Sequence, residues 1–237
     1  ELSNGRFDIS IGPIVKLWNI GTENARVPSQ SEIDSKIRLV NYNNVVLNES
    51  QKSVMLKEKD MILDLGGIAK GYAADAISEI LKEYKVKHAI VNLGGNVFAY
   101  GNKPDGSKWK IGIQNPFSKR GDYIGIVNVE NKTVVTSGIY ERFFEKEGKH
   151  YHHILDPETG YPVENNLVAV SIIADKSIDA DSLSTSAFAL GLEKGLKLIE
   201  QLENTDAIFI TSDFEVYITS GLKDDFILKD TDFKLIN

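Results

Sequence analysis

The sequence predicts an α+β fold in which helices accompany mixed or antiparallel sheets, rather than a doubly wound parallel sheet. Two observations support this prediction. Short β-rich runs outnumber the helical segments, and turn sequences typical of hairpins occur at residues 102–107, 146–149 and 211–214. The chain has 237 residues, and a chain of this length buries about 70% of the surface that it exposes when unfolded. That is ample for a core, in one large domain or two small lobes.

Eight short runs are expected to form strands: residues 45–47, 61–65, 88–93, 108–114, 123–129, 168–174, 207–211 and 215–219. Three segments are expected to be helical. Residues 29–40 begin with Ser-Gln-Ser-Glu, a capping signature, and residues 71–84 and 181–202 each place apolar side chains on one stripe. Gly191 and Gly195 interrupt the last segment, so it forms one helix or two. No linker composition interrupts the chain, and we expect a single domain over residues 1–237.

The composition excludes several classes of protein. The chain has 34 acidic and 27 basic side chains, a formal net charge of −7, which argues against a general affinity for nucleic acid. It has no cysteine, so neither a disulfide nor a cysteine-ligated metal is possible. No apolar run approaches the roughly 20 residues that span a bilayer. The absence of cysteine fits an oxidising exterior and a bacterial cytosol equally.

The segment 61–84 is predicted to run from a strand through a glycine loop into a helix. Paired glycines let the backbone approach a ligand closely, and a helix N-terminus favours anions. Lys70 is expected in the loop, and Asp64 at the strand end could hydrogen-bond a ligand. The spacing does not match a phosphate-binding loop of the NTPase kind. The alternative is that this segment is only a tight strand-to-helix connection, in which Asp64 stabilises the turn.

Two further regions could carry chemistry. If residues 181–185 are helical, Asp181 and Thr185 share one face with Ser184 beside them, and their oxygens would suit Mg²⁺. The alternative is that these side chains cap a helix N-terminus. His150, His152 and His153 cluster before the turn sequence of residues 156–160, where His153 could be catalytic or structural. A zinc site there would need ligands from elsewhere in the chain.

Six segments together resemble the ApbE family, the FAD:protein FMN transferases. They occur in the family order and are residues 7–13 with 17–18, 64–75, 92–96, 136–138 with Tyr140, 153–162, and 181–185. The resemblance implies a duplicated α+β fold of the T-fold kind, consistent with an internal echo between residues 62–67 and 90–95. It also implies Mg²⁺-dependent transfer of FMN from FAD to a Thr or Ser hydroxyl of an acceptor protein, with release of AMP.

The resemblance also assigns residues. It implies a metal site made of Asp181, Thr185 and the Gly67 carbonyl, with Ser184 as the less certain member because some relatives carry a carboxylate there. It implies that FAD is held by Arg6, Phe7, Asp8, Asp64, Lys70 and the Leu155 backbone. His153 matches the family's histidine near the reacting phosphate. We hypothesise that His153 accepts the proton of the attacking hydroxyl.

Two alternatives from the same resemblance stay open. One is an FAD pyrophosphatase in which water replaces the acceptor hydroxyl, and the other is a non-catalytic FAD-binding lipoprotein. Relatives carry a further N-terminal segment, and the chain begins with Glu1 rather than methionine, so we expect that a targeting segment is missing. The resemblance implies an extracytoplasmic protein anchored to the membrane as a lipoprotein, with acceptors among membrane redox complexes and exported flavoproteins.

Overall fold

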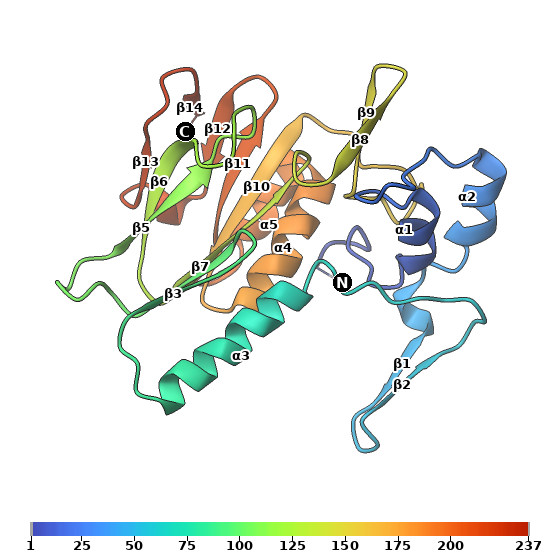
Figure 1. Ribbon diagram of the computed structural model, residues 1–237, viewed down its shortest axis with the longest axis horizontal. Coiled ribbons are helices and arrows are strands. Elements are labelled where there is room, and N and C mark those ends of the chain that lie inside the picture. Colours follow the sequence, from blue (N-terminus) through green and yellow to red (C-terminus); the bar gives the residue numbers. More distant parts are fainter. Residues whose placement is uncertain (1, 237) are drawn as a thin grey trace. The chain divides into compact units, whose positions relative to one another are not determined.

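The computed structural model describes residues 2–236 and confirms the predicted α+β class (Figure 1). The chain forms two compact units, each built from two separate stretches of sequence. The N-terminal unit contains the residues up to Leu65 together with Ile139–Glu164. The sheet unit contains Gly66–Gly138 and the residues from Asn165 onwards. Each unit has its own sheets and helices and is described by itself.

The sheet unit is organised around a seven-stranded sheet with the order β14-β12-β11-β10-β7-β4-β3. All neighbouring strands are antiparallel except β12 and β14, which are parallel. A second sheet has the order β13-β6-β5. The strands are β3 (Ala89–Leu93), β4 (Asn96–Tyr100), β5 (Trp109–Gln114), β6 (Tyr123–Val129), β7 (Lys132–Gly138), β10 (Leu167–Ala174), β11 (Asp206–Thr211), β12 (Glu215–Ile218), β13 (Phe226–Leu228) and β14 (Lys234–Ile236).

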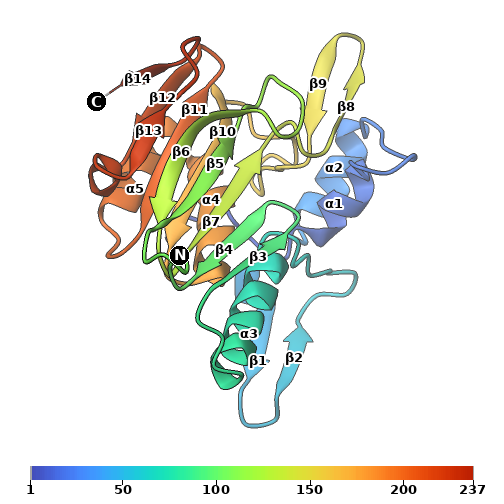
Figure 2. The ribbon, with the colours of Figure 1, turned by 60° about the vertical axis from the view of Figure 1, so that its left-hand side comes forward.

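Three helices of the sheet unit pack against the large sheet: α3 (Ala69–Glu83), α4 (Ser177–Leu190) and α5 (Leu192–Glu200). Figures 1 and 2 show α4 and α5 on one side of this sheet and the smaller sheet on the other. Every residue of the central strand β10 is buried, because a strand covered on both faces has no side for polar residues. Its sequence, Leu-Val-Ala-Val-Ser-Ile-Ile-Ala, is correspondingly apolar except for Ser171, whose hydroxyl lies 2.6 Å from the hydroxyl of Thr136.

The N-terminal unit is smaller and has less regular structure. Its elements are α1 (Gly12–Trp18), α2 (Gln30–Ile37), a 3₁₀ turn η1 (Tyr42–Asn44), the hairpin β1 (Val45–Asn48) and β2 (Ser53–Leu56), and the hairpin β8 (Phe143–Lys146) and β9 (Lys149–His152). Trp18 is fully buried in its core, and its indole N–H donates to the Gly160 carbonyl at 2.7 Å. The Trp18 ring also lies 5.5 Å from the ring of Tyr151.

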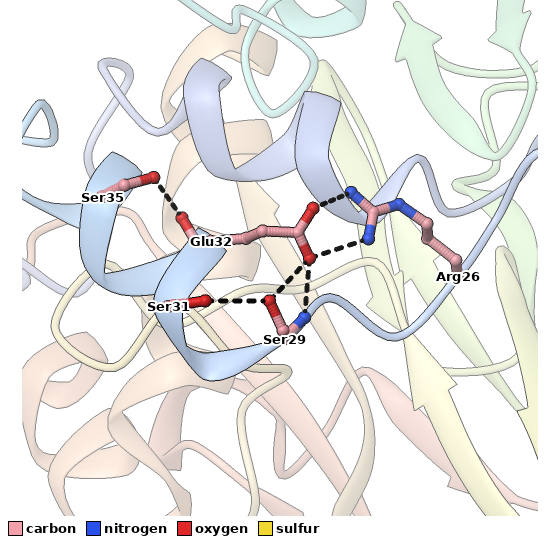
Figure 3. A network of polar contacts seen from close by, with 5 residues as sticks. All are labelled: Arg26, Ser29, Ser31, Glu32 and Ser35. Carbon is pink, nitrogen blue, oxygen red and sulfur yellow. Dashed lines mark hydrogen bonds and ion pairs between the residues drawn. The ribbon is translucent and has the colours of Figure 1, made fainter.

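The predicted capping signature at residues 29–32 is present at the start of α2 (Figure 3). Glu32 Oε2 accepts hydrogen bonds from the Ser29 backbone N–H at 2.8 Å and the Ser29 hydroxyl at 2.9 Å. Arg26 donates to both carboxylate oxygens, at 2.7 and 3.0 Å. The Arg26 hydrogen bond, followed by those of Ser29, lowers the pKa of Glu32 to about 2.

The structure corrects several sequence expectations. Residues 61–65 do not form a strand, since within them only Ile62 makes a β-bridge, to Ile11. The echo of residues 62–67 in 90–95 is therefore not a repeated strand. The turn at 102–107 joins β4 to β5, which lie in different sheets, so it is not a hairpin. The segment 181–202 forms two helices, α4 and α5, which meet at Gly191. No helix in residues 2–236 is long and apolar enough to cross a membrane.

Candidate functional site

The predicted metal-binding residues lie just before α3 and along α4 of the sheet unit, and Asp181 contacts the first turn of α3. Gly71, in the first turn of α3, contacts the start of α4 so closely that an added Cβ would lie 2.3 Å from the Ser177 carbonyl oxygen. Only glycine allows this approach, because any side chain would force the two helices apart. The backbones of α3 and α4 can therefore approach this closely because Gly71 has no side chain.

The two helices stabilise each other's N-termini through carboxylates. Asp75 of α3 accepts the N–H groups of Ser177 and Ile178 at 2.7 and 2.9 Å. Asp181 of α4 accepts the N–H of Gly71 at 2.9 Å. The first N–H groups of a helix have no partner within the helix, and its N-terminal dipole favours negative charge. Each carboxylate therefore accepts backbone N–H groups at the start of the other helix that have no hydrogen-bond partner within that helix.

Asp181 has the properties of a buried carboxylate that keeps one oxygen available. The residue is only 4% exposed, and burial raises its pKa, while the Gly71 hydrogen bond and the charge of Lys70 act in the opposite direction. Its Oδ2 receives the Gly71 hydrogen bond, whereas Oδ1 accepts none from the described residues. Since α4 begins at Ser177, Asp181 lies inside the helix. Asp181 therefore does not cap its own helix, but the capping alternative holds for the neighbouring one, because its carboxylate accepts an N–H in the first turn of α3.

Three hydroxyl groups cluster where the end of β7 meets α4. Ser137, near the end of β7, has its Oγ 2.8 Å from Ser184 Oγ and 3.1 Å from Thr185 Oγ1. Ser184 is fully buried, and its hydroxyl also donates to the Asp181 carbonyl at 2.9 Å. Thr185 is half-buried. Of the predicted side-chain ligands, Asp181 and Thr185 are therefore better placed to meet a cation than Ser184, whose hydroxyl already has two partners.

The carboxylate, hydroxyl and carbonyl oxygens of these residues are the kinds of ligand atom that Mg²⁺ takes. Within residues 2–236, no group of three or more His, Asp or Glu side chains could hold a metal. A cation at this position would therefore depend on one carboxylate, on hydroxyl and carbonyl oxygens, and on water or substrate oxygens. Mg²⁺ takes oxygen ligands, keeps several waters and binds through one or two carboxylates together with substrate phosphates. Gly67 lies in the turn that leads directly into α3.

Lys70 is the second residue of α3 rather than part of a loop, so that expectation is wrong. The helix starts earlier than residue 71 because Ala69 and Lys70 are good helix formers. Burial raises the pKa of Asp181, and the positive charge of Lys70 partly opposes that rise, so the ammonium group lies near the carboxylate. Lys70 thus belongs to the same helix N-terminus as the Gly71 amide.

The predicted flavin-binding residues of the N-terminal unit are tightly bonded within that unit. Asp8 is buried, and its Oδ1 accepts the backbone N–H and hydroxyl of Ser10 at 2.8 and 2.7 Å, while Oδ2 accepts the N–H of Tyr42 at 3.0 Å. The Asp64 backbone N–H donates to the Ile9 carbonyl at 2.7 Å. Asp8 therefore shapes the backbone of residues 7–10, and Phe7, which is half-buried, lies beside it.

Arg6 forms ion pairs with the turn that follows the histidines. Its guanidinium contacts Asp156 at 2.5 Å and Glu158 at 3.0 Å. The turn itself depends on Gly160, which has a φ of +74° and a Cα so close to Ile33 that an added Cβ would lie 2.7 Å from the Ile33 Cγ2 atom. Leu155 is buried and forms a β-bridge with Pro162 across this turn.

The three clustered histidines occupy different environments. His150 and His152 lie on one face of β9, as predicted, with ring centroids 6.3 Å apart. His152 is buried, and burial lowers its pKa to about 4. His153 follows β9 and is half-buried, with its Nδ1 3.2 Å from the Arg142 carbonyl oxygen. His153 is thus the more accessible of this adjacent pair.

Sequence reasoning missed two residues of the sheet-unit site, Ser137 and Asp75. Ser137 stands in the Thr-Ser-Gly segment, but β7, which positions it, was not among the predicted strands. A run of Val-Val-Thr directly before it is a β signal that could have indicated the strand. Asp75 lies in the middle of the predicted helix, and its role depends on the start of α4, a hundred residues later. No local sequence signal could have shown that contact.

Comparisons with known proteins agree with this description. The model of the ApbE family matches residues 1–209. An FAD:protein FMN transferase of Klebsiella pneumoniae (strain 342) is 41% identical over 98% of this chain and 71% of that protein. One of Treponema pallidum (strain Nichols) is 39% identical over 99% of this chain and 68% of that protein.

A solved structure extends the likeness to the fold. The crystal structure of an ApbE protein from Thermotoga maritima superposes with a TM-score of 0.85 at 34% identity and covers 94% of this chain and 72% of that chain. The family match extends over both units, and the identity to relatives holds over nearly the whole sequence. This chain belongs to the ApbE family.

Proposed function

We propose that this chain transfers FMN from FAD to a Thr or Ser hydroxyl of an acceptor protein, with Mg²⁺ as cofactor and AMP as the second product. The observation that carries the proposal is the buried Asp181 carboxylate, which accepts the Gly71 N–H at the start of α3 through one oxygen and lies about one turn of α4 before the clustered hydroxyls of Ser184 and Thr185. Relatives that are up to 41% identical over nearly the whole chain are named FAD:protein FMN transferase. A carrier that only binds FAD needs no such site.

Asp181 and Thr185 would hold the magnesium ion together with the Gly67 carbonyl, and Ser184 would orient the cluster or contribute its hydroxyl. When bound, Mg²⁺ neutralises phosphate charge and stabilises the developing charge on the leaving oxygen. Lys70 adds a positive charge at the N-terminus of α3, where backbone N–H groups also favour an anion. These groups suit the pyrophosphate of FAD.

The reaction forms one bond and breaks another. The acceptor hydroxyl oxygen attacks the phosphorus on the FMN side of the pyrophosphate, and the bond from that phosphorus to the bridging oxygen breaks, so that AMP leaves with the bridging oxygen. His153 accepts the proton of the attacking hydroxyl. A neutral imidazole suits this role because its ordinary pKa lies near neutrality. Water in place of the hydroxyl gives FMN and AMP, the pyrophosphatase alternative.

Arg6, Phe7, Asp8, Asp64 and the Leu155 backbone are the proposed flavin-binding residues of the N-terminal unit. Their roles differ, because the Asp8 carboxylate already accepts three hydrogen bonds within its unit. Asp8 would therefore act by holding the backbone of Phe7 in place. Arg6, fixed by Asp156 and Glu158, would present its remaining donors to the ligand.

The proposed acceptor is a flavoprotein with a Thr or Ser flavinylation site. We also propose an extracytoplasmic location with a membrane anchor, which rests on the family resemblance and is compatible with the absence of cysteine. Fractionation of cells that produce the full-length protein would test the location. Recovery of the full-length protein in the cytosolic fraction, soluble without detergent, would contradict this location.

The test of the function is incubation with FAD and Mg²⁺, with and without an acceptor domain. AMP is followed by chromatography, and flavin that stays on the acceptor after denaturation is followed by mass spectrometry. Transfer gives both products, hydrolysis gives AMP and free FMN, and a carrier gives neither. Asp181→Asn should abolish both products, whereas Asp179→Asn, which changes an exposed carboxylate in the first turn of the same helix, should leave them unchanged.

A further inference from the structure

Two adjacent imidazoles in the N-terminal unit have opposite hydrogen-bonding patterns. His152 is the last residue of β9, and His153 follows it. A backbone N–H can only donate and a backbone carbonyl can only accept, so the partners of each ring nitrogen fix which nitrogen carries the proton in a neutral imidazole. Both histidines have such backbone partners.

His152 is held from both sides of its ring. Its Nδ1 accepts the Ile154 backbone N–H at 3.3 Å, and its Nε2 lies 3.0 Å from the Val163 carbonyl oxygen. Nε2 must therefore carry the proton. Because Val163 N–H also donates to the Ile154 carbonyl at 2.9 Å, the buried His152 ring closes a small network that fixes the backbone of residues 152–154.

His153 has the reverse pattern. Its Nδ1 lies 3.2 Å from the Arg142 carbonyl oxygen, which also accepts the His153 backbone N–H at 3.1 Å. Nδ1 must therefore carry the proton, and Nε2 carries the lone pair. Phe143 and His152 are paired in the β8–β9 hairpin, so Arg142 and His153 stand at the next position of the same ladder. The register of the hairpin thus brings the carbonyl to the ring.

We infer that His152 is a positioning residue for His153, and that together with the Arg142 carbonyl it sets His153 as the Nδ1–H tautomer. The lone pair is then on Nε2, the nitrogen that would accept a proton, so the ring does not need to exchange tautomers first. His152 acts through the backbone, because its two hydrogen bonds fix the peptide that carries His153. This inference rests on the proposed function only for the use of Nε2 as the proton acceptor.

The test combines a measurement of tautomers with kinetics. Long-range ¹H–¹⁵N correlation spectra of the full chain, uniformly ¹⁵N-labelled and held at about pH 8.5, report the tautomer of each neutral imidazole, since the ordinary histidine pKa is about 6.5. The chain has only four histidines, so single substitutions assign them. We expect His153 as the Nδ1–H tautomer and His152 as the Nε2–H tautomer. A predominant Nε2–H form of His153 would overturn the inference.

Two variants separate positioning from folding. His152→Asn keeps an acceptor for the Ile154 N–H but cannot reach the Val163 carbonyl. We expect the Nδ1–H population of His153 to fall and kcat for AMP release to drop about tenfold or more with KM for FAD little changed, because small displacements of a reacting group are costly. The matched control is His150→Asn. It changes a histidine of the same strand that stacks on Phe143 at 4.4 Å, and it should leave both values unchanged.

The outcomes distinguish this inference from the proposed function. The spectra need no substrate, so they test the tautomers even if no FMN transfer is observed. An unchanged His153 tautomer and unchanged kcat in His152→Asn would overturn the positioning role. If the tautomers are as expected but His153→Asn still transfers FMN at the full rate, the tautomer assignment stands and the proposed role of His153 as the base is wrong.

Discussion

Asp75 and Asp181 stabilise the beginnings of each other's helices. Asp75 of α3 accepts N–H groups of the first two residues of α4, and Asp181 of α4 accepts an N–H from the first turn of α3. The arrangement explains why the Lys-Gly-Tyr-Ala-Ala-Asp sequence and the sequence of residues 181–185 belong to one site. A change in either carboxylate is expected to affect the partner helix as well as its own.

Asp75→Ala should destabilise the protein by about 1–2 kcal/mol, since the loss of a capping side chain leaves helix N–H groups without partners. Chemical denaturation with a linear extrapolation would measure the change. Glu79→Ala is the control on the same helix, because the Glu79 side chain is exposed and its pair with Lys82 is loose, at 3.9 Å. An equal loss in the two variants would show that Asp75 does not cap α4.

Gly71→Ala should be more damaging than Asp75→Ala. The new Cβ would lie 2.3 Å from the Ser177 carbonyl oxygen and 2.6 Å from Ile178 Cα, and backbone atoms cannot move aside as a flexible side chain can. Forced separation of packed elements costs about 1–3 kcal/mol or more. Thermal unfolding would show a lower midpoint. A midpoint equal to that of the parent chain would contradict the close contact of α3 and α4.

Mg²⁺ should raise the unfolding temperature of the parent chain, because a ligand that binds only the folded state stabilises it by mass action. Asp181→Asn should remove this effect, and Asp179→Asn should retain it. Differential scanning fluorimetry with and without a chelator would measure the shifts. A Mg²⁺-dependent shift that persists in Asp181→Asn would place the ion elsewhere.

His152 should make the stability of the protein depend on pH. Burial lowers its pKa to about 4 in the folded state, against an ordinary value of about 6.5. Between these values the unfolded chain binds more protons, so stability rises with pH through this window and its full value is reached above pH 6.5. The contribution is on the order of 3 kcal/mol.

Denaturation at several pH values would show this slope, and His152→Gln should flatten it. His88→Gln is the control, because His88 is exposed. A slope that is the same in all three proteins would mean that other groups cause it.

Trp18→Phe should cost about 1–3 kcal/mol, since it leaves the buried Gly160 carbonyl without its donor. Trp109→Phe removes a similar indole hydrogen bond, to the Gly101 carbonyl at 3.1 Å, but from a half-buried residue. Its effect should be smaller because water can replace the lost donor. Denaturation of both variants gives the comparison, and a larger loss in Trp109→Phe would contradict the assignment of Trp18 to the core.

The sequence predicted what depends on local patterns. The apolar stripe and capping signature of α2, the glycine break at Gly191 and the β-rich character of β10 all appear in the structure. The prediction of a strand at residues 61–65 was wrong, because only Ile62 pairs with a neighbouring segment and no ladder extends from it. Sequence reasoning also missed α1, because seven residues beginning Gly-Pro carry too few turns to show a period.

The site was predictable in composition and not in geometry. The ordered motifs indicated Asp181, Thr185 and His153, but the contacts that define their environment join distant parts of the chain. Gly71 meets Asp181 across 110 positions, and Ser137 meets Ser184 across 47. Such contacts depend on the packing of sheets and helices, which hydrophobic periodicity does not encode.

The division of each unit into two stretches has a consequence for biosynthesis. On the ribosome, residues up to Leu65 emerge long before Ile139–Glu164. The Trp18 indole has no Gly160 carbonyl to bond until 142 further residues have been translated. Over that interval the indole and the apolar face of α1 have no complete core to enter. The N-terminal unit thus finishes folding after much of the sheet unit has been made, and a nascent chain arrested before Gly160 would expose a segment for chaperones to bind.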